Sequence, residues 1–250
     1  MEKTGDKVFR FGLLGKNISY SFSKGYFSSK FSELGLENYS YENFDIEDIS
    51  GFTNIFQNTK NISGLNVTIP YKEAIIPYLN ELAPSAKAIG AVNTIKICPS
   101  GPKGYNTDAY GFQKSLEPYL KDHHKKALIL GTGGASKAVA YVLKVLNIDY
   151  TFVSRTGKNN WFTYESLNQE IIEKYSLIIN CSPLGTYPNI SEKPNIPYTY
   201  INKDHLLFDL IYNPEKTAFL AHGEAKGATI VNGLRMLELQ AEKAWEIWNA

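Results

Sequence analysis

Apolar residues recur along this chain with two spacings, and these spacings predict strands that alternate with helices. Residues 8–14 and 62–69 form short apolar runs, which are typical of buried strands. Residues 23–34 carry an apolar stripe at helical spacing, and Gly35 follows as a helix stop. Strands that alternate with helices predict an α/β fold with a mostly parallel sheet covered by helices.

The same patterns divide the chain into two consecutive runs of elements. In the first run we expect strands at 8–14, 39–44, 62–69 and 91–97, helices at 23–34, 48–56 and 73–82, the last of them broken near Pro77, and a turn at 99–104. In the second run we expect strands at 127–130, 150–154, 177–180, 206–210 and 229–231, helices at 108–119, 135–146, 164–175, 217–226 and 234–248, and an exposed loop at 183–197. A chain of 250 residues with two such runs can form two domains.

Composition narrows the classes of function. The formal net charge is only +1, which argues against nucleic acid as the main partner. No apolar stretch is long enough to cross a membrane, and the polar residues 1–7 lack the apolar core of a signal peptide. Cys98 and Cys181 show no metal-type spacing and fit a reducing compartment. We therefore expect a cytoplasmic protein that binds small molecules and needs no metal.

The most informative local feature is a glycine-rich turn in the middle of the chain. Residues 125–136 read KKALILGTGGAS, an apolar run followed at once by a helical pattern. In dinucleotide sites the glycines let the backbone approach a pyrophosphate, and the free N–H groups of the helix start face that anion. The usual fingerprint ends in glycine or alanine, and this one ends in Ser136. By itself the loop leaves two interpretations open, a dinucleotide site or a glycine turn without a ligand.

The end of the next expected strand bears on the choice of nucleotide. Residues 153–158 read VSRTGK, and no carboxylate follows before Glu165. An acidic residue there would bind the ribose hydroxyls of NAD, whereas an arginine accommodates the 2′-phosphate of NADP. Arg155 can grip that phosphate with its guanidinium fork, and Lys158 supplies a second cation. The pattern favours NADP over the alternative of a polar turn with an incidental arginine.

Seven motifs occur in the order seen in the shikimate dehydrogenase family, and the chain resembles that family over nearly its whole length. The motifs are SFSK (21–24), NVTIPYK (66–72), GAVNT (90–94), GYNTDAYG (104–111), GTGGAS (131–136), SRT (154–156) and GLRML (233–237). The resemblance implies an oxidoreductase that reversibly reduces 3-dehydroshikimate to shikimate with NADPH in aromatic amino-acid biosynthesis. The chain departs from the family pattern at Gly25, where proline is common, and at Ser154, where asparagine is common.

The resemblance also implies a catalytic pair. The reaction moves a hydride to a ketone carbon and a proton to its oxygen, so the protein must stabilise a developing alkoxide. Lys72 and Asp108 match the family's catalytic lysine and carboxylate. Without the motifs, Lys72 reads as a solvated lysine and Asp108 as the cap of the helix after it. Which group passes the proton stays open between Lys72, water and Asp108.

The resemblance assigns the remaining site residues to substrate or cofactor. Ser21 and Ser23 match a clamp for the substrate carboxylate, although alone they read as a helix cap and its neighbour. The other residues matched to substrate binding are Asn66, Thr68, Asn93, Tyr212 and Gln240. Those matched to NADP are Gly131, Gly133, Gly134, Ala135, Ser136, Ser154, Arg155, Thr156, Lys158, Asn180, Ser182 and Gly233.

The resemblance therefore predicts two α/β domains with the site in the cleft between them. We expect a mixed, mostly parallel substrate domain at 1–107, completed by a C-terminal helix at 233–250, and a Rossmann-like NADP domain at 108–232. A monomer or a homodimer fits equally well. Two rival functions remain, a quinate/shikimate dehydrogenase that prefers NAD and a catalytically silent NADP-binding regulator.

Overall fold

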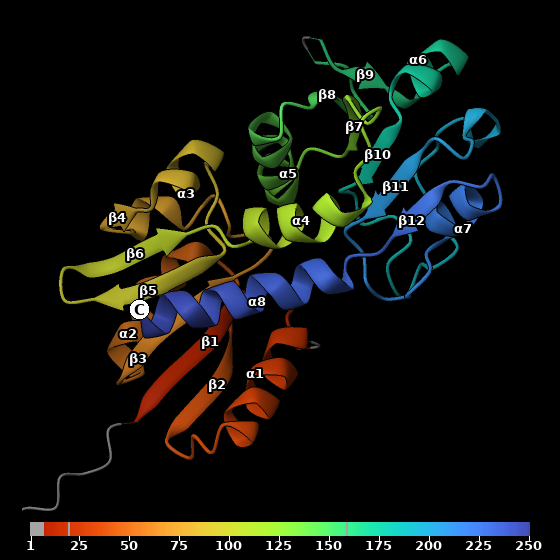
Figure 1. Cartoon of the computed structure of the whole chain (residues 1–250). Coiled ribbons are helices and arrows are strands. Elements are labelled where there is room, and N and C mark those ends of the chain that lie inside the picture. Colours follow the sequence, from red (N-terminus) through yellow and green to blue (C-terminus); the bar gives the residue numbers. More distant parts are fainter. Residues whose placement is uncertain (1–7, 20, 159) are drawn as a thin grey trace, which may run out of the picture. The chain divides into compact units, whose positions relative to one another are not determined.

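The computed structural model describes residues 8–19, 21–158 and 160–250 (Figure 1). The N-terminal segment 1–7, on which the expectation of no signal peptide rests, lies outside the described residues. The chain splits into two compact units, which are described separately below. Unit 1 comprises Met1–Thr107 and Ala241–Ala250, and unit 2 comprises Asp108–Gln240. No helix of the described residues has both the length and the apolar composition to cross a membrane.

Unit 1 is built on a mixed six-stranded sheet with the order β2-β1-β3-β5-β6-β4. Its strands are β1 (Phe9–Gly15), β2 (Tyr39–Asp45), β3 (Ile62–Val67), β4 (Glu81–Leu82), β5 (Thr94–Cys98) and β6 (Gly101–Tyr105). β1 pairs in parallel with β2 and β3, whereas β5 runs antiparallel to both β3 and β6. The expected mixed α/β sheet is confirmed.

Two local predictions in unit 1 need correction. The expected turn at 99–104 is present but is confined to residues 99–100. Gly101, with a left-handed φ of 108°, already begins β6, which pairs back onto β5. The expected helix at 73–82 is instead a run of turns and a short 3₁₀ helix, η2 (Ile76–Tyr78), followed by β4. Pro77 has no N–H to continue a helix, and pairing with β6 draws residues 81–82 into the sheet.

The helices of unit 1 pack on both faces of its sheet. They are α1 (Phe22–Glu33), α2 (Phe52–Asn58) with the 3₁₀ turn η1 (Ile49–Gly51) before it, and α3 (Pro84–Ile89), which the apolar spacing did not predict. One core cluster gathers residues of α2, α3 and the strands around Leu65. A second cluster on the other face joins Phe11 and Phe27 to Ala241, Ala244 and Trp248 from the end of the chain.

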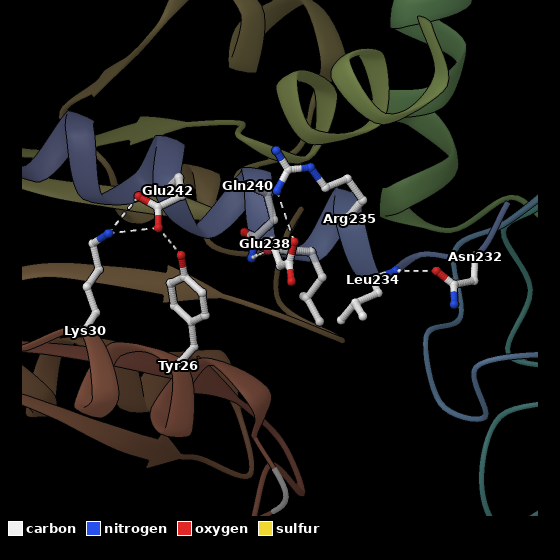
Figure 2. Close-up of polar contacts among 9 residues, drawn as sticks. Tyr26, Lys30, Asn232, Leu234, Arg235, Glu238, Gln240 and Glu242 are labelled. Atoms are coloured by element: carbon white, nitrogen blue, oxygen red, sulfur yellow. Dashed lines mark hydrogen bonds and ion pairs between the residues drawn. The ribbon is translucent and has the colours of Figure 1, made fainter. Parts of the chain in front are cut away.

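The last helix, α8 (Leu234–Asn249), contributes residues to both units, and its second half belongs to unit 1. Trp248 packs against Phe11 and Phe27, with ring centroids 4.8 and 5.1 Å apart, and its indole N–H donates to the Ile95 carbonyl at 3.0 Å. Figure 2 shows Glu242 of the same helix bound to the Lys30 ammonium and the Tyr26 hydroxyl of α1. The C-terminal segment is thus part of the hydrophobic core of unit 1.

Unit 2 is a parallel six-stranded sheet with the order β12-β11-β10-β7-β8-β9. Its strands are β7 (Lys126–Leu130), β8 (Asp149–Ser154), β9 (Phe162–Thr163), β10 (Leu177–Asn180), β11 (Leu206–Asp209) and β12 (Thr229–Val231). β7 lies between β8 and β10, so the chain order reverses at β7 and the carboxyl ends there form a switch point. The Rossmann-like architecture expected for this region is confirmed.

The helices of unit 2 lie at the expected positions. Those expected at 108–119, 164–175 and 217–226 are shorter, and the one expected at 135–146 is shifted by one residue. The observed helices are α4 (Asp108–Leu116), α5 (Gly134–Val145), α6 (Gln169–Lys174) and α7 (Ala218–Glu224), with 3₁₀ turns η3 (Glu117–Tyr119), η4 (Tyr164–Ser166) and η5 (Tyr198–Tyr200). The expected helix at 164–175 is broken because Asn168 caps a new helix, accepting from the Ile171 N–H at 3.0 Å. β9 was not predicted, since two residues are too few to show a period.

Candidate active site

In unit 1, polar side chains gather where the parallel strands β1, β2 and β3 end. Ser21 follows β1 and is the N-cap of α1, accepting from the Lys24 N–H at 3.3 Å. Ser23 lies in the first turn of the same helix and is buried. The register places Leu13 of β1 beside Asn66 of β3. The two serines therefore follow β1, and Asn66 lies near the end of the neighbouring strand β3. Ser21 therefore does cap the helix, as the alternative interpretation of this residue stated. A capping hydroxyl accepts a hydrogen bond through its oxygen, so its own hydrogen is still available to donate to a ligand.

Asn66 and Asn93 are joined in one buried polar network. The Tyr41 hydroxyl donates to Asn66 Oδ1 at 2.7 Å, and the Asn66 amide donates to Thr94 Oγ1 at 3.3 Å. Asn93 Oδ1 accepts from the Thr107 N–H at 2.7 Å, and its amide donates to Thr107 Oγ1 at 2.9 Å. These five side chains are all 4% exposed or less, which is far below the usual exposure of asparagine and threonine. Satisfied buried amides of this kind hold a fixed orientation.

The turn that follows Asn66 carries the candidate lysine. Thr68 is tied to β1 by its N–H, which donates to the Leu14 carbonyl at 2.9 Å. Lys72 is half-buried in the turns at 69–75, and its carbonyl accepts from the Val92 N–H at 2.7 Å. The neighbouring Tyr71 is buried, and its hydroxyl donates to the Ile46 carbonyl at 2.7 Å. Several hydrogen bonds therefore fix the backbone of the turn that carries Lys72.

Asp108 belongs to unit 2, where it is the first residue of α4 and is 6% exposed. A carboxylate in the first turn interacts favourably with the positive end of the helix dipole. The residue just before it, Thr107, belongs to the Asn93 network of unit 1. Asp108 therefore directly follows in sequence a residue, Thr107, whose N–H is held by Asn93.

In unit 2 the glycine loop has the local structure that a close backbone approach requires. Gly131 adopts a left-handed φ of 110°, and a Cβ there would lie 3.2 Å from the Cys181 backbone. Gly133, in contrast, is the N-cap of α5, and a Cβ there would point into open space. The buried Ser136 hydroxyl donates to the Gly133 carbonyl at 2.6 Å. Serine in place of glycine therefore closes the loop internally, and Gly134 and Ala135 stay half-buried at the helix start.

The turn after β8 lies at the same edge of the sheet as the glycine loop. The Gly131 N–H donates to the Val153 carbonyl at 3.0 Å, so the loop begins beside the end of β8. The Ser154 hydroxyl donates to the Thr156 carbonyl at 2.5 Å, which shapes the turn. Arg155, Thr156 and Lys158 are exposed, and Lys158 lies over the Trp161 ring. Two cations next to a glycine-rich helix start are an arrangement that can hold a phosphate.

Asn180 ends β10 and is fully buried, with its amide used inside the protein. Its Nδ2 donates to Asp209 Oδ1 at 3.0 Å, and its Oδ1 accepts from the Ser182 N–H and hydroxyl at 3.0 and 2.6 Å. Asp209 also accepts from the Thr217 hydroxyl at 2.6 Å. Asn180 therefore acts as a support for the loop after β10, while Ser182 remains half-buried at its surface. Burial raises the pKa of the Asp209 carboxyl to about 6, although hydrogen bonds from Thr217, Ile211 and Asn180 oppose the shift.

This raised pKa predicts a pH-dependent stability. An Asp209 pKa above its unfolded value means that the native state binds more protons, so its contribution to stability is complete below pH ~4 and is lost as the pH rises through about 6. In Asp209→Asn that contribution is absent. We expect the unfolding free energy of the wild type, relative to that of the variant, to fall by up to about 3 kcal/mol from pH 4 to pH 7. Urea unfolding at several pH values measures it, and a pH-independent difference would contradict the prediction.

The last three predicted residues lie at or near α8. Gly233 comes directly before the helix, and a Cβ there would collide with the Leu210 carbonyl, so only glycine fits. Asn232 accepts from the Leu234 N–H at 3.2 Å and starts the helix (Figure 2). Gln240 is buried, its amide donates to the Leu237 carbonyl at 2.9 Å, and Ala241, the next residue, belongs to the core of unit 1. Tyr212 follows β11 and is 37% exposed.

The structure thus groups the predicted residues by unit. Within unit 1 it brings together Ser23, Asn66 and Asn93, and within unit 2 it brings together the glycine loop, the Ser154 turn and the Asn180 loop. Sequence reasoning missed Tyr41, Thr94, Thr107 and Asp209, which hold those residues. Asp209 had a signal, since it is a carboxylate at the end of an apolar strand. The described residues contain no cluster of histidine, cysteine or acidic side chains that could hold a metal ion.

Comparison with known proteins agrees with this geometry. Residues 13–95 match the model of the shikimate dehydrogenase substrate binding domain. A protein of Clostridium botulinum named shikimate dehydrogenase (NADP+) is 38% identical, and the alignment covers 96% of each chain. One of the same name from Methanococcus vannielii is 36% identical, with 97% of this chain and 92% of that protein covered.

A solved structure gives the same result for the fold. It is shikimate 5-dehydrogenase from Thermus thermophilus in complex with NADP(H) and shikimate, 30% identical with a TM-score of 0.84, covering 96% of this chain and 93% of that one. Relatives above 30% identity that align from end to end leave one conclusion. The chain belongs to the shikimate dehydrogenase family.

Proposed function

We propose that this protein catalyses the reversible, NADP-dependent reduction of 3-dehydroshikimate to shikimate in aromatic amino-acid biosynthesis. The observation that carries the proposal is the buried Asn66–Asn93 network, which fixes two amides beside the turn of Lys72. Asn66 comes just before that turn in sequence, and Asn93 follows Val92, whose N–H donates to the Lys72 carbonyl. A buried polar network with an adjacent cation suits a substrate that bears several hydroxyls and a carbonyl. The family membership supplies the identity of that substrate.

The chemistry divides between cofactor and protein. The cofactor supplies a hydride to the ketone carbon, and the carbonyl oxygen becomes an alkoxide that takes up a proton. The Lys72 ammonium stabilises that developing charge, and the Asp108 carboxylate is its partner in the proposed catalytic pair and holds it in place. Both residues are present, which disfavours a catalytically silent regulator. The proton donor remains open between Lys72 and a relay through water or Asp108.

The substrate contacts follow from the chemistry of each side chain. Ser21 and Ser23 donate to the substrate carboxylate, and the amides of Asn66 and Asn93 together with Thr68 bind its hydroxyls. Tyr212 closes over the carboxylate and Gln240 reaches the substrate, as the family motif implies. We therefore assign substrate recognition to unit 1, completed by these two residues.

The cofactor contacts are assigned to unit 2. Gly131, Gly133, Gly134, Ala135 and Ser136 would form the pyrophosphate loop, and Ser154, Arg155, Thr156 and Lys158 would hold the 2′-phosphate. Ser182 and Gly233 would line the nicotinamide, with Asn180 holding Ser182 in place. The open space at Gly133 and the exposure of Arg155 fit an NADP at this edge of the sheet.

The compartment and assembly are part of the proposal. Cys98 and Cys181 are both free thiols, which supports the predicted reducing cytoplasm. The predicted partners are the small-molecule substrate and cofactor, without nucleic acid. A monomer or a homodimer remains the prediction for the assembly.

The decisive experiment follows nicotinamide reduction with shikimate and with quinate, each with NADP and with NAD. We expect the highest kcat/KM for shikimate with NADP. A preference for quinate or NAD would favour the rival dehydrogenase. Absence of turnover with all four pairs, in a protein that still binds NADP, would favour the silent regulator.

Replacing Arg155 tests the assignment of the phosphate turn. Arg155→Ala is expected to raise the KM for NADP about tenfold or more, because a charge-assisted contact to a phosphate contributes about 1.5–3 kcal/mol. The KM for NAD, which lacks that phosphate, should change little. Lys144→Ala, on the far end of α5, serves as a charge-matched control. Equal losses with both cofactors would indicate structural damage instead of lost phosphate recognition.

A further inference from the structure

A tyrosine outside the family motifs lies beside Asn66, one of the proposed substrate-binding residues of unit 1. Tyr41 is on β2, 4% exposed, and its ring stacks on Phe27 of α1 with centroids 4.8 Å apart. Its hydroxyl meets two polar side chains from different elements. It donates to Asn66 Oδ1 at 2.7 Å, and the Ser23 hydroxyl near it partly opposes the rise in the Tyr41 pKa that burial causes.

The directions of these hydrogen bonds follow from counting hydrogens. The Asn93 carbonyl can only accept, and it lies 3.4 Å from the Asn66 amide nitrogen, so the Asn66 oxygen faces Tyr41. Tyr41 must then give its single hydrogen to Asn66. With its hydrogen used in this way, the Tyr41 oxygen can only accept from any other polar group beside it. Burial raises the pKa of the Tyr41 phenol far above its ordinary value, so the hydrogen is present at any working pH.

Beyond Asn66 the hydrogen bonds continue in the same direction. The Asn66 amide donates to Thr94 Oγ1, which donates to Asn93 Oδ1 at 3.2 Å. The Asn93 amide donates to Thr107 Oγ1 at 2.9 Å, and Thr107 is the residue directly before Asp108 in sequence. Removing one hydroxyl from such a buried chain leaves an acceptor without a donor, and the amides beyond it lose their fixed orientation.

We infer that Tyr41 is a positioning residue for substrate recognition, because its hydroxyl donates to the Asn66 side chain and fixes which way the Asn66 amide faces. The inference rests on the proposed function, which makes Asn66 a substrate ligand.

The test compares Tyr41→Phe with Tyr39→Phe by steady-state kinetics and thermal unfolding. Tyr41→Phe keeps the ring and removes only the hydroxyl, and Tyr39 lies on the same strand and in the same aromatic cluster but outside the polar chain. We expect Tyr41→Phe to raise the KM for shikimate about tenfold while the KM for NADP changes less than about twofold. Tyr39→Phe should leave both KM values unchanged. A structural role alone would lower the melting temperature without this division between substrate and cofactor.

Thr94→Val provides a second variant at the other end of the Asn66 amide. It should shift the KM for shikimate in the same direction but less, since the Asn93 carbonyl remains as an acceptor. Wild-type turnover with an unchanged KM for shikimate in both Tyr41→Phe and Thr94→Val would overturn this inference alone. Absence of shikimate turnover by the wild type would overturn the proposed function and this inference with it.

Discussion

Lys72→Ala is expected to lower kcat for shikimate oxidation at least about a hundredfold, which corresponds to ~3 kcal/mol of transition-state stabilisation. The reason is that a fixed cation beside the reacting oxygen interacts most strongly when that oxygen carries charge. The backbone of Lys72 is anchored through the Val92 N–H, and the turn is anchored through the Tyr71 hydroxyl. Neither anchor uses the lysine side chain, so the variant should fold.

The measurement is kcat and KM for shikimate with saturating NADP, accompanied by a thermal melt. Lys87→Ala is a suitable control, because Lys87 is exposed on α3 of the same unit and has no proposed role. Its kcat should match that of the wild type. If Lys72→Ala kept near-normal kcat with only a raised KM, Lys72 would contribute uniform binding and not transition-state stabilisation.

Trp248→Ala is expected to lower the unfolding free energy of unit 1 by about 3–5 kcal/mol, as truncation of a buried aromatic side chain does. The indole packs among Phe11, Phe27 and Tyr41, and its ring lies so close to Gly64 that a Cβ there would collide with it. The substitution also leaves the Ile95 carbonyl without its donor. A loss of this size is a large part of the total stability of a domain.

Urea unfolding followed by circular dichroism measures this loss, and Trp248→Phe separates its two causes. Phenylalanine keeps most of the packing and removes the N–H, so it should cost about 1 kcal/mol from the lost hydrogen bond plus a small packing term. A loss below about 1 kcal/mol for Trp248→Ala would mean that the end of α8 adds little to the core of unit 1.

The parts of the site that sequence predicts well are those whose signals are local. The glycine loop is an example, since a strand, a turn and a helix start occur within twelve residues and Gly131 needs its left-handed φ whatever lies around it. The helix at 73–82 is a contrary example. Its apolar spacing was compatible with a helix, but pairing of β4 with β6 and the missing N–H of Pro77 gave another structure.

The supporting residues escaped sequence reasoning because each acts on a partner far away in the chain. Tyr41 is one of 17 tyrosines, and nothing near it in sequence marks its contact with Asn66, 25 residues later. Asp209 supports Asn180, 29 residues earlier, through a contact that exists only because β10 and β11 are neighbours in the sheet. Pairwise contacts across strands leave no periodic trace in a single sequence.

Local patterns and ordered motifs were enough to establish the two runs of strands and helices, the family, and the residue types that the chemistry needs. These features can be read from the sequence because the periodicity of a strand or helix and the conformation of a turn depend on residues that are close together in the chain. Strand order, the return of α8 into the core beside Phe11, and the buried chain of hydrogen bonds from Tyr41 to Thr107 arose only on folding. These features depend on which apolar surfaces and buried polar groups find partners in three dimensions, and that pairing joins residues far apart in the chain.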